Sequence, residues 1–235
     1  MQIARYFDAI YNGLSIALLL ALAIAVIRGL LLARSDSPSD RSHGRGAALV
    51  AFGTALALSG GLVADGFLKS SPWFQQVRFG FYFLGFALLV VGTMMVIRGA
   101  TLGRGPRWRA LPFALLGLFV ASLAVSVPLV TIPSTFVLNK FQEQVQLPIY
   151  WLPMLVSTAA GAVVLFVVAA SAARRSRARA ICVGVFEGLI FLGLLRESEL
   201  LPDLGDPLVN LLVSFVPFVV GGIVLAVGAG ISSRA

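Results

Sequence analysis

The sequence predicts an all-α membrane protein, a seven-transmembrane-helix bundle that forms a single polytopic domain over residues 1–235. Hydrophobic residues make up 59% of the chain and charged residues only 12%, whereas roughly a quarter of a soluble domain is charged. Apolar runs of about 20 residues, the length that crosses a bilayer core, recur along the whole chain. These runs do not alternate apolar and polar residues, so they do not fit the strands of a membrane β-barrel.

The first three spans are bounded by charged or polar segments. Span one continues past Arg28 to Ala33, which makes it long enough to cross the membrane and distinguishes it from a cleaved signal peptide. Span two follows the polar segment RSDSPSDRSHGRG, and span three ends immediately before Arg98. We place them at Tyr11–Ala33, Ala47–Ala64 and Phe79–Ile97.

The remaining four spans follow in the same way. Span four begins after the arginines of the preceding loop, and span five follows the longest outer loop. Span six is the shortest and carries Glu187 within GVFEGLIFLGLL, while span seven contains Pro217, which can kink a helix. We place them at Leu111–Ile132, Ile149–Ser171, Ala180–Leu195 and Pro207–Gly230.

The basic residues predict the orientation of the bundle. The loops after spans one, three and five and the tail carry 12 Lys and Arg, against 5 on the opposite side. Basic loops remain in the cytoplasm, so we expect the N-terminus outside and the C-terminus inside. The richer side comprises Arg34, Arg41, Arg45, Arg98, Arg104, Arg107, Arg109, Arg174, Arg175, Arg177, Arg179 and Arg234.

A weak internal repeat relates spans one to three to spans five to seven. In the aligned third and seventh spans, Gly85 coincides with Gly221 and Gly92 with Gly228. Both triplets would start on the same side, which gives a parallel 3+1+3 repeat of a kind found in some transporters, with span four as the linker. A chance match between two glycine-bearing apolar helices would look the same, so both interpretations stay open.

The rare residue types exclude most membrane chemistries. Cys182 is the only cysteine and His43 the only histidine, which argues against disulfide redox, bis-histidine haem and a Ser-His-Asp triad. The two lysines, Lys69 and Lys140, lie in predicted loops, so a retinal Schiff base in the last span is excluded. We expect no enzyme activity, no cofactor and no metal site, and we expect the segment around His43 to be a flexible, solvated connector.

An intramembrane acid is the main candidate for function. Glu187 is predicted about 10 Å and Arg28 about 8 Å from the cytoplasmic boundary, so the two depths match. An ionisable residue in a span is by default a functional hypothesis. Three roles for Glu187 remain open. It fixes two helices through an ion pair with Arg28 or a hydrogen bond to Ser or Thr, it is a proton or cation site, or it faces a water-filled vestibule. Arg28 alone can instead extend to the headgroups.

Small and polar residues complete the candidate site. Asn210 of span seven joins Glu187 and Arg28 as a candidate intramembrane polar group. Small residues let helices approach closely, and we therefore expect helix packing at Gly184, Gly188, Gly221 and Gly222.

Three functions fit these observations. The first is a small-solute or ion translocator that uses Glu187. The second is an accessory or scaffold subunit of a larger membrane complex that binds lipid or an apolar pigment. The third is a seven-helix sensor that acts through a separate partner. The net charge of +8 arises from loop arginines, so we expect membrane lipids as partners, and a homo-oligomer or larger complex in the cell membrane of a bacterial type, but no nucleic acid.

Overall fold

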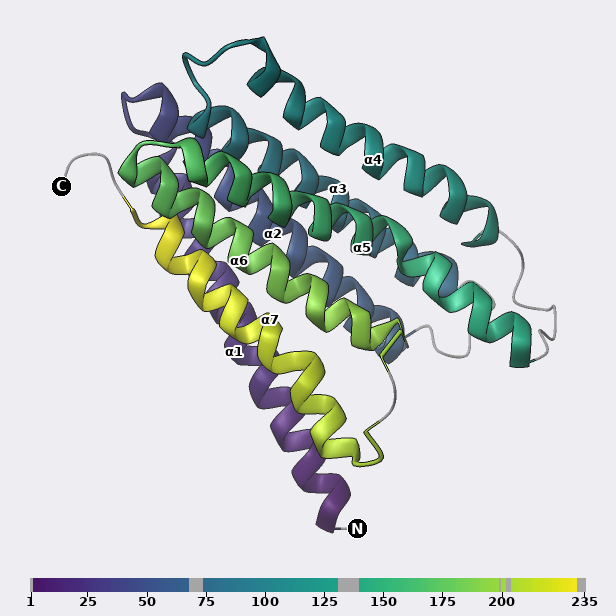
Figure 1. Ribbon diagram of the computed structural model, residues 1–235. Coiled ribbons are helices and arrows are strands. Elements are labelled where there is room, and N and C mark those ends of the chain that lie inside the picture. The colour runs from purple at the N-terminus through teal and green to yellow at the C-terminus, as the bar shows by residue number, and fades with distance from the viewer. Residues whose placement is uncertain (1, 68–73, 131–139, 199, 202–203, 232–235) are drawn as a thin grey trace.

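The structure, a computed structural model, describes residues 2–67, 74–130, 140–198, 200–201 and 204–231. These residues form seven α-helices and no strand, which agrees with the predicted all-α class. The helices lie side by side along their lengths, and the two termini lie at opposite ends of the bundle (Figure 1). The helices are α1 (Gln2–Leu32), α2 (Pro38–Phe67), α3 (Phe74–Ala100), α4 (Pro106–Val130), α5 (Lys140–Ser171), α6 (Arg174–Glu197) and α7 (Pro207–Ala229).

Six of these helices are long and apolar enough to cross a membrane, within the described part of the chain. The chain is therefore a multi-pass membrane protein, and six of the seven predicted spans coincide with these segments. The predicted span Ala47–Ala64 falls in α2, but part of it lies outside the residues whose side chains are described, so its crossing stays a prediction. The six segments are Ala9–Leu32, Val77–Ala100, Pro106–Val127, Trp151–Ser171, Arg174–Arg196 and Pro207–Ala229.

Prolines begin several helices, as their fixed φ and missing N–H allow at the first helical position. Pro38 and Pro106 open α2 and α4. Pro207 opens α7 behind Asp206, whose side chain accepts hydrogen bonds from the backbone N–H groups of Leu208 and Val209. This N-cap satisfies donors that have no partner within the helix, so the start of α7 is fixed locally by sequence.

The connector between the first two helices differs from the prediction. We expected a solvated segment around His43, but α2 begins at Pro38, and His43 is only 3% exposed. Asp40, one turn earlier, is 1% exposed. Asp40 and His43 thus belong to a buried polar cluster at the end of the bundle opposite the N-terminus, whereas Arg41 and Arg45 of the same segment are exposed.

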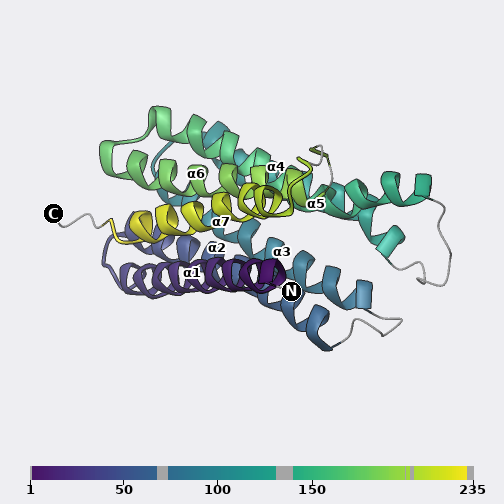
Figure 2. The same ribbon diagram turned by 90° about the horizontal axis from the view of Figure 1, so that it is seen from below.

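The helices form two groups of three. α2 packs between α1 and α3, and α6 packs between α5 and α7. The groups meet where α1 contacts α7 and where α3 contacts α5, with smaller contacts of α2 with α7 and α3 with α6. α4 packs mainly on α3 and α5, at the edge of the bundle (Figure 1). Seen from below, α7 lies between α1 and α6 (Figure 2).

The closest helix pair, α2 and α3, packs through glycines spaced seven residues apart. Gly46 and Gly53 of α2 meet Gly92 and Gly85 of α3. A Cβ atom added at Gly92 would lie 2.6 Å from the carbonyl oxygen of Gly46, so only glycine permits this approach. A seven-residue spacing keeps one seam facing a partner helix along its whole length. The sequence contained this signal, although our sequence analysis did not single it out.

The glycines named from sequence also lie at helix contacts. A Cβ added at Gly184 would lie 3.3 Å from the Cβ of Leu165 in α5, and one added at Gly188 would lie 4.0 Å from the Cβ of Ala162. These two glycines thus face α5. The neighbouring pair in α7 faces two different helices, because Gly221 lies against Phe186 of α6 and Gly222 against Leu18 of α1.

Candidate functional site

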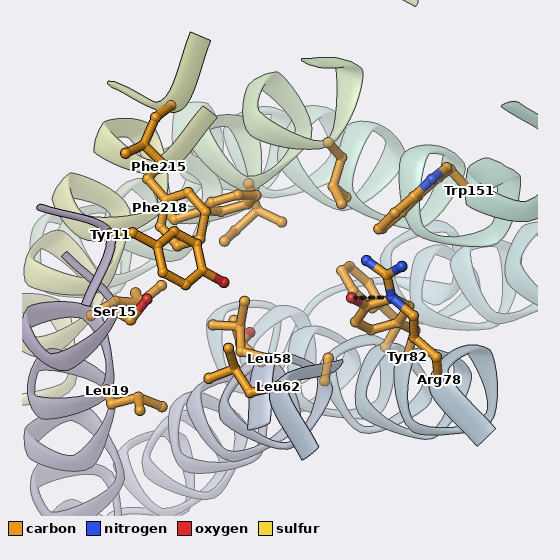
Figure 3. A pocket seen from close by; sticks show the side chains of 17 residues that line it. Tyr11, Ser15, Leu19, Leu58, Leu62, Arg78, Tyr82, Trp151, Phe215 and Phe218 are labelled. Atoms are coloured by element: carbon orange, nitrogen blue, oxygen red, sulfur yellow. Dashed lines mark hydrogen bonds between the residues drawn. The ribbon is translucent and has the colours of Figure 1, made fainter. Parts of the chain in front are cut away.

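A cavity of about 260 Å³ lies in the half of the bundle that holds the N-terminus. Side chains from α1, α2, α3, α5, α6 and α7 surround it, so it occupies the space between the two groups of three helices (Figure 3). We call it the aromatic cavity. Its lining residues are Tyr11, Ser15, Leu18, Leu19, Thr54, Ala57, Leu58, Leu62, Arg78, Tyr82, Phe86, Trp151, Ile190, Leu194, Leu211, Phe215 and Phe218.

Two aromatic groups face each other across this cavity (Figure 3). On one side Tyr11 packs edge-on against Phe215, with ring centroids 4.9 Å apart. On the other side Tyr82 packs against Trp151 with centroids 5.2 Å apart, and Arg78 donates a hydrogen bond from Nε to the Tyr82 hydroxyl at 3.3 Å. Among the described residues that line the cavity, Arg78 alone is charged, so this lining suits a small, largely apolar or aromatic molecule.

Glu187 lies below the floor of the aromatic cavity, fully buried at 0% exposure. It precedes the lining residue Ile190 by three positions in α6, a rise of about 4.5 Å. Its Oε1 is hydrogen-bonded to the hydroxyl of Thr93 in α3, and its Oε2 has no hydrogen-bond partner among the described residues. Oε2 lies over Gly161 of α5, where an added Cβ would overlap it. The carboxyl group therefore fills a space that glycine leaves open, at the meeting of α3, α5 and α6.

Thr93 can serve both protonation states of this acid. Its hydroxyl lies 3.0 Å from the carbonyl oxygen of Leu89, and it also contacts Glu187. A hydroxyl has one proton to donate and lone pairs that accept. With Glu187 ionised, Thr93 donates to the carboxylate. With Glu187 protonated, the carboxylic acid donates to Thr93, which then donates to Leu89. A change of protonation thus requires only a hydroxyl rotation.

The expected Glu187–Arg28 pair is not formed. Nη1 of Arg28 donates instead to the carbonyl oxygen of Ala226 at 3.1 Å, one of the carbonyls that the last turn of α7 leaves without an intrahelical partner. Equal depth did not bring the two groups together, because Glu187 faces α3 and α5 while Arg28 faces α7. The alternative weighed with this pair, a hydrogen bond to Ser or Thr, is the contact present.

Asn210 lies in the first turn of α7, far along that helix from the level of Glu187. Its side-chain oxygen accepts a hydrogen bond from the backbone N–H of Leu204 at 3.2 Å. The contact closes the turn before α7, next to the Asp206 cap. Asn210 is thus placed at the helix end rather than beside Glu187.

A buried ion pair closes the end of the bundle opposite the aromatic cavity. Nη1 of Arg179 in α6 lies 2.6 Å from Oδ1 of Asp40 in α2, and both side chains are 3% exposed or less. Nε of Arg179 also donates to the carbonyl oxygen of Ile231 at 3.0 Å. This pair therefore joins α2, α6 and the segment after α7. The sequence analysis missed it, because Arg179 was counted as a loop arginine and Asp40 as part of a connector.

His43 lies beside this ion pair. Burial, and secondarily the positive charge of Arg179, lower the pKa of His43 to about 3, although a hydrogen bond to the backbone of Gly228 and the charge of Asp40 act in the opposite direction. The ring is therefore neutral at physiological pH. Its Nε2 and Nη2 of Arg179 are both buried without a hydrogen-bond partner among the described residues, which leaves an acceptor and a donor unused in one cluster.

The comparisons with known proteins give no family for the chain. No protein-family model matches it, and no curated protein or solved structure matches it significantly. The function is therefore argued from the arrangement of the aromatic cavity, the acid below it and the ion pair at the opposite end.

Proposed function

We propose that the protein is a membrane translocator that moves a small, largely apolar or aromatic solute together with a proton carried by Glu187. The observation that carries this proposal is the placement of the acid. Glu187 is completely buried, one of its oxygens has no hydrogen-bond partner in the described part of the chain, and it precedes Ile190, which lines a cavity large enough for a small molecule, by about one helical turn. Buried ionisable groups in membrane spans typically mark proton or ion pathways.

The helix arrangement supports a transport cycle. Suppose that α1, α2 and α3 correspond to α5, α6 and α7. The contacts within the first group, α1 with α2 and α2 with α3, then match those of α5 with α6 and α6 with α7. The contacts between the groups also match in pairs: α1 with α7 corresponds to α5 with α3, and α2 with α7 corresponds to α6 with α3. Parallel repeats related in this way surround the substrate site of some transporters, which open alternately by rocking one repeat against the other.

The contacts at the two ends of the bundle support an inward-closed state. The aromatic cavity lies toward the N-terminal end, which we expect to be outside. At the opposite end, the Asp40–Arg179 pair joins one helix of each group. This pair has to separate before the cavity can open on that side. The buried pair would then act as the inner gate, and Glu187 would lie between the gate and the cavity.

The lining of the aromatic cavity also favours a second function. Apart from Arg78, it consists of apolar, aromatic and uncharged polar side chains, which would equally hold an acyl chain or an apolar pigment permanently. The protein would then be an accessory subunit, and Glu187 a structural group bonded to Thr93. The sensor hypothesis stays a prediction that no particular contact favours.

The two functions are separated first by purification from the native membrane in mild detergent. Mass spectrometry and an absorption spectrum of the same peak detect companion subunits or a bound pigment, which favour the accessory function. For a protein that purifies alone, thermal-shift screening of small aromatic and aliphatic solutes identifies a ligand. Uptake of that ligand into proteoliposomes is then measured with and without an imposed proton gradient.

The decisive variant is Glu187→Gln, which keeps the volume and the hydrogen bond to Thr93 but cannot exchange a proton. We expect gradient-driven uptake to fall to background, while ligand binding in detergent is retained. Asp36→Asn is the matched control, because it also replaces a carboxylate by an amide, but at an exposed position near the end of the bundle opposite the aromatic cavity. Uptake by Glu187→Gln at the wild-type rate would contradict the proposal.

A further inference from the structure

A second cavity, separate from the aromatic one, lies between α3 and α4. Its volume is about 550 Å³, and it shares no lining residue with the aromatic cavity. We call it the α3–α4 groove. It is lined by Val91, Met94, Met95, Arg98, Thr101, Leu102, Gly103, Arg109, Pro112 and Phe113.

The groove is basic at one end and apolar along the rest of its length. Arg98 lies in the last turn of α3 and Arg109 in the first turn of α4, so both lie at the end of the bundle opposite the N-terminus. Val91 precedes Arg98 by seven residues, about 10 Å along α3, and Phe113 follows Arg109 by four, about 6 Å along α4. The groove thus has the charge distribution that an anionic amphiphile requires.

The two arginines are available for a ligand. Both side chains are exposed, and neither guanidinium forms a hydrogen bond or an ion pair with any described residue. Arg104, in the same turn, contrasts with them. Its guanidinium donates to Oγ of Ser171 at 2.6 Å and lies 4.9 Å from the centre of the Trp108 ring. Arg104 therefore holds the α3–α4 turn against α5, while Arg98 and Arg109 are left at the mouth of the groove.

The apolar part of the groove is open on its outer side. Phe113 is 70% exposed and Val91 is 42% exposed, and the main packing partners of α4 among the described residues are α3 and α5. Within a membrane, such a surface faces the acyl chains of lipids. The mouth of the groove lies where the headgroups of the same leaflet are expected, on the side that the basic loops assign to the cytoplasm.

We propose that the α3–α4 groove is a binding site for one anionic phospholipid. One acyl chain packs along Val91, Met94 and Phe113, and the phosphate is bound between Arg98 and Arg109. Guanidinium groups bind phosphate oxygens in pairs with good geometry, and basic pockets between transmembrane helices are known sites for anionic headgroups. This inference is independent of the proposed transport function.

The test is native mass spectrometry of the full chain in detergent, titrated with phosphatidylglycerol or with phosphatidylcholine of the same acyl chains. We expect phosphatidylglycerol to bind preferentially. The double variant Arg98→Gln with Arg109→Gln should weaken its binding about twenty-fivefold, at about fivefold for each arginine. The matched control is Arg107→Gln with Arg174→Gln, which removes two exposed arginines outside the groove and should bind like the wild type.

Four results would overturn the proposal. The first is equal binding of the two lipids by the wild type. The second is equal loss of phosphatidylglycerol in the double variant and its control, with both variants eluting as folded protein, since this would indicate general charge attraction. The third is complete cross-linking of Phe113→Cys between two copies in the membrane, because the groove would then be occupied by protein. Deacylated glycerophosphoglycerol should not compete; full competition would remove the role assigned to the apolar groove.

Discussion

Breaking the Asp40–Arg179 pair tests the assignment of the inner end of the bundle. Both side chains are 3% exposed or less, and the two charged atoms are 2.6 Å apart. Replacing Asp40 by Asn leaves the guanidinium of Arg179 buried without its counterion. Loss of one partner from a buried pair costs about 3–5 kcal/mol, so Asp40→Asn and Arg179→Gln should each lower the free energy of unfolding by about that amount.

The double variant distinguishes this pair from a simple loss of packing. Asp40→Asn combined with Arg179→Gln leaves no isolated charge and can still form a neutral hydrogen bond. We expect it to recover much of the stability that either single variant loses, so the two effects are strongly non-additive. The measurement is the fraction of monodisperse protein after heating in detergent, as a function of temperature. Additive losses, or single variants as stable as the wild type, would refute the reasoning.

Three further predictions concern the buried contacts. The pKa of His43 is about 3 in the folded protein and 6.5 in the unfolded chain, so the folded ring is neutral. The free energy of unfolding is therefore highest above pH 6.5 and decreases at lower pH, by about 2 kcal/mol at pH 5. Thermal unfolding of His43→Gln should lack this pH dependence. Gly161→Ala should displace the Glu187 carboxyl at a cost of about 1–3 kcal/mol and reduce gradient-driven uptake, whereas Gly80→Ala, which meets no atom within 4 Å, should do neither. Gly92→Leu should separate α2 from α3 and abolish folded expression, while Gly117→Leu, also in open space, should be tolerated.

The sequence predicted much of the fold, because the length of an apolar run is a one-dimensional property. The orientation inferred from loop charge stays a prediction. Six predicted spans coincide with long apolar helices of the described chain. The helices are longer than the predicted spans, since α6 begins at Arg174 rather than Ala180, and α5 begins at Lys140 although its apolar segment, Trp151–Ser171, agrees with the predicted start at Ile149. Charged residues at helix ends extend helices beyond their apolar segments, and hydropathy does not detect that extension.

The candidate site was predicted less completely, because pairing depends on the direction in which a side chain leaves its helix. Glu187 was identified by its charge in an apolar segment, but its partner is Thr93 rather than Arg28. Asp40 and Arg179 are 139 positions apart in the sequence, and each lies among other polar residues. Nothing in one sequence indicates which of several polar residues at a helix end turns inward.

Proton movement coupled to solute movement tests the central claim most directly. Proteoliposomes containing a trapped pH-sensitive dye are supplied with the identified solute at equal internal and external pH. The account predicts that the lumen acidifies as solute enters through the wild-type protein, and that Glu187→Gln, although still able to bind the solute, gives no pH change. Solute entry without proton movement in the wild type, or acidification of the lumen by Glu187→Gln to the wild-type extent, would contradict the assignment of Glu187 as the proton carrier.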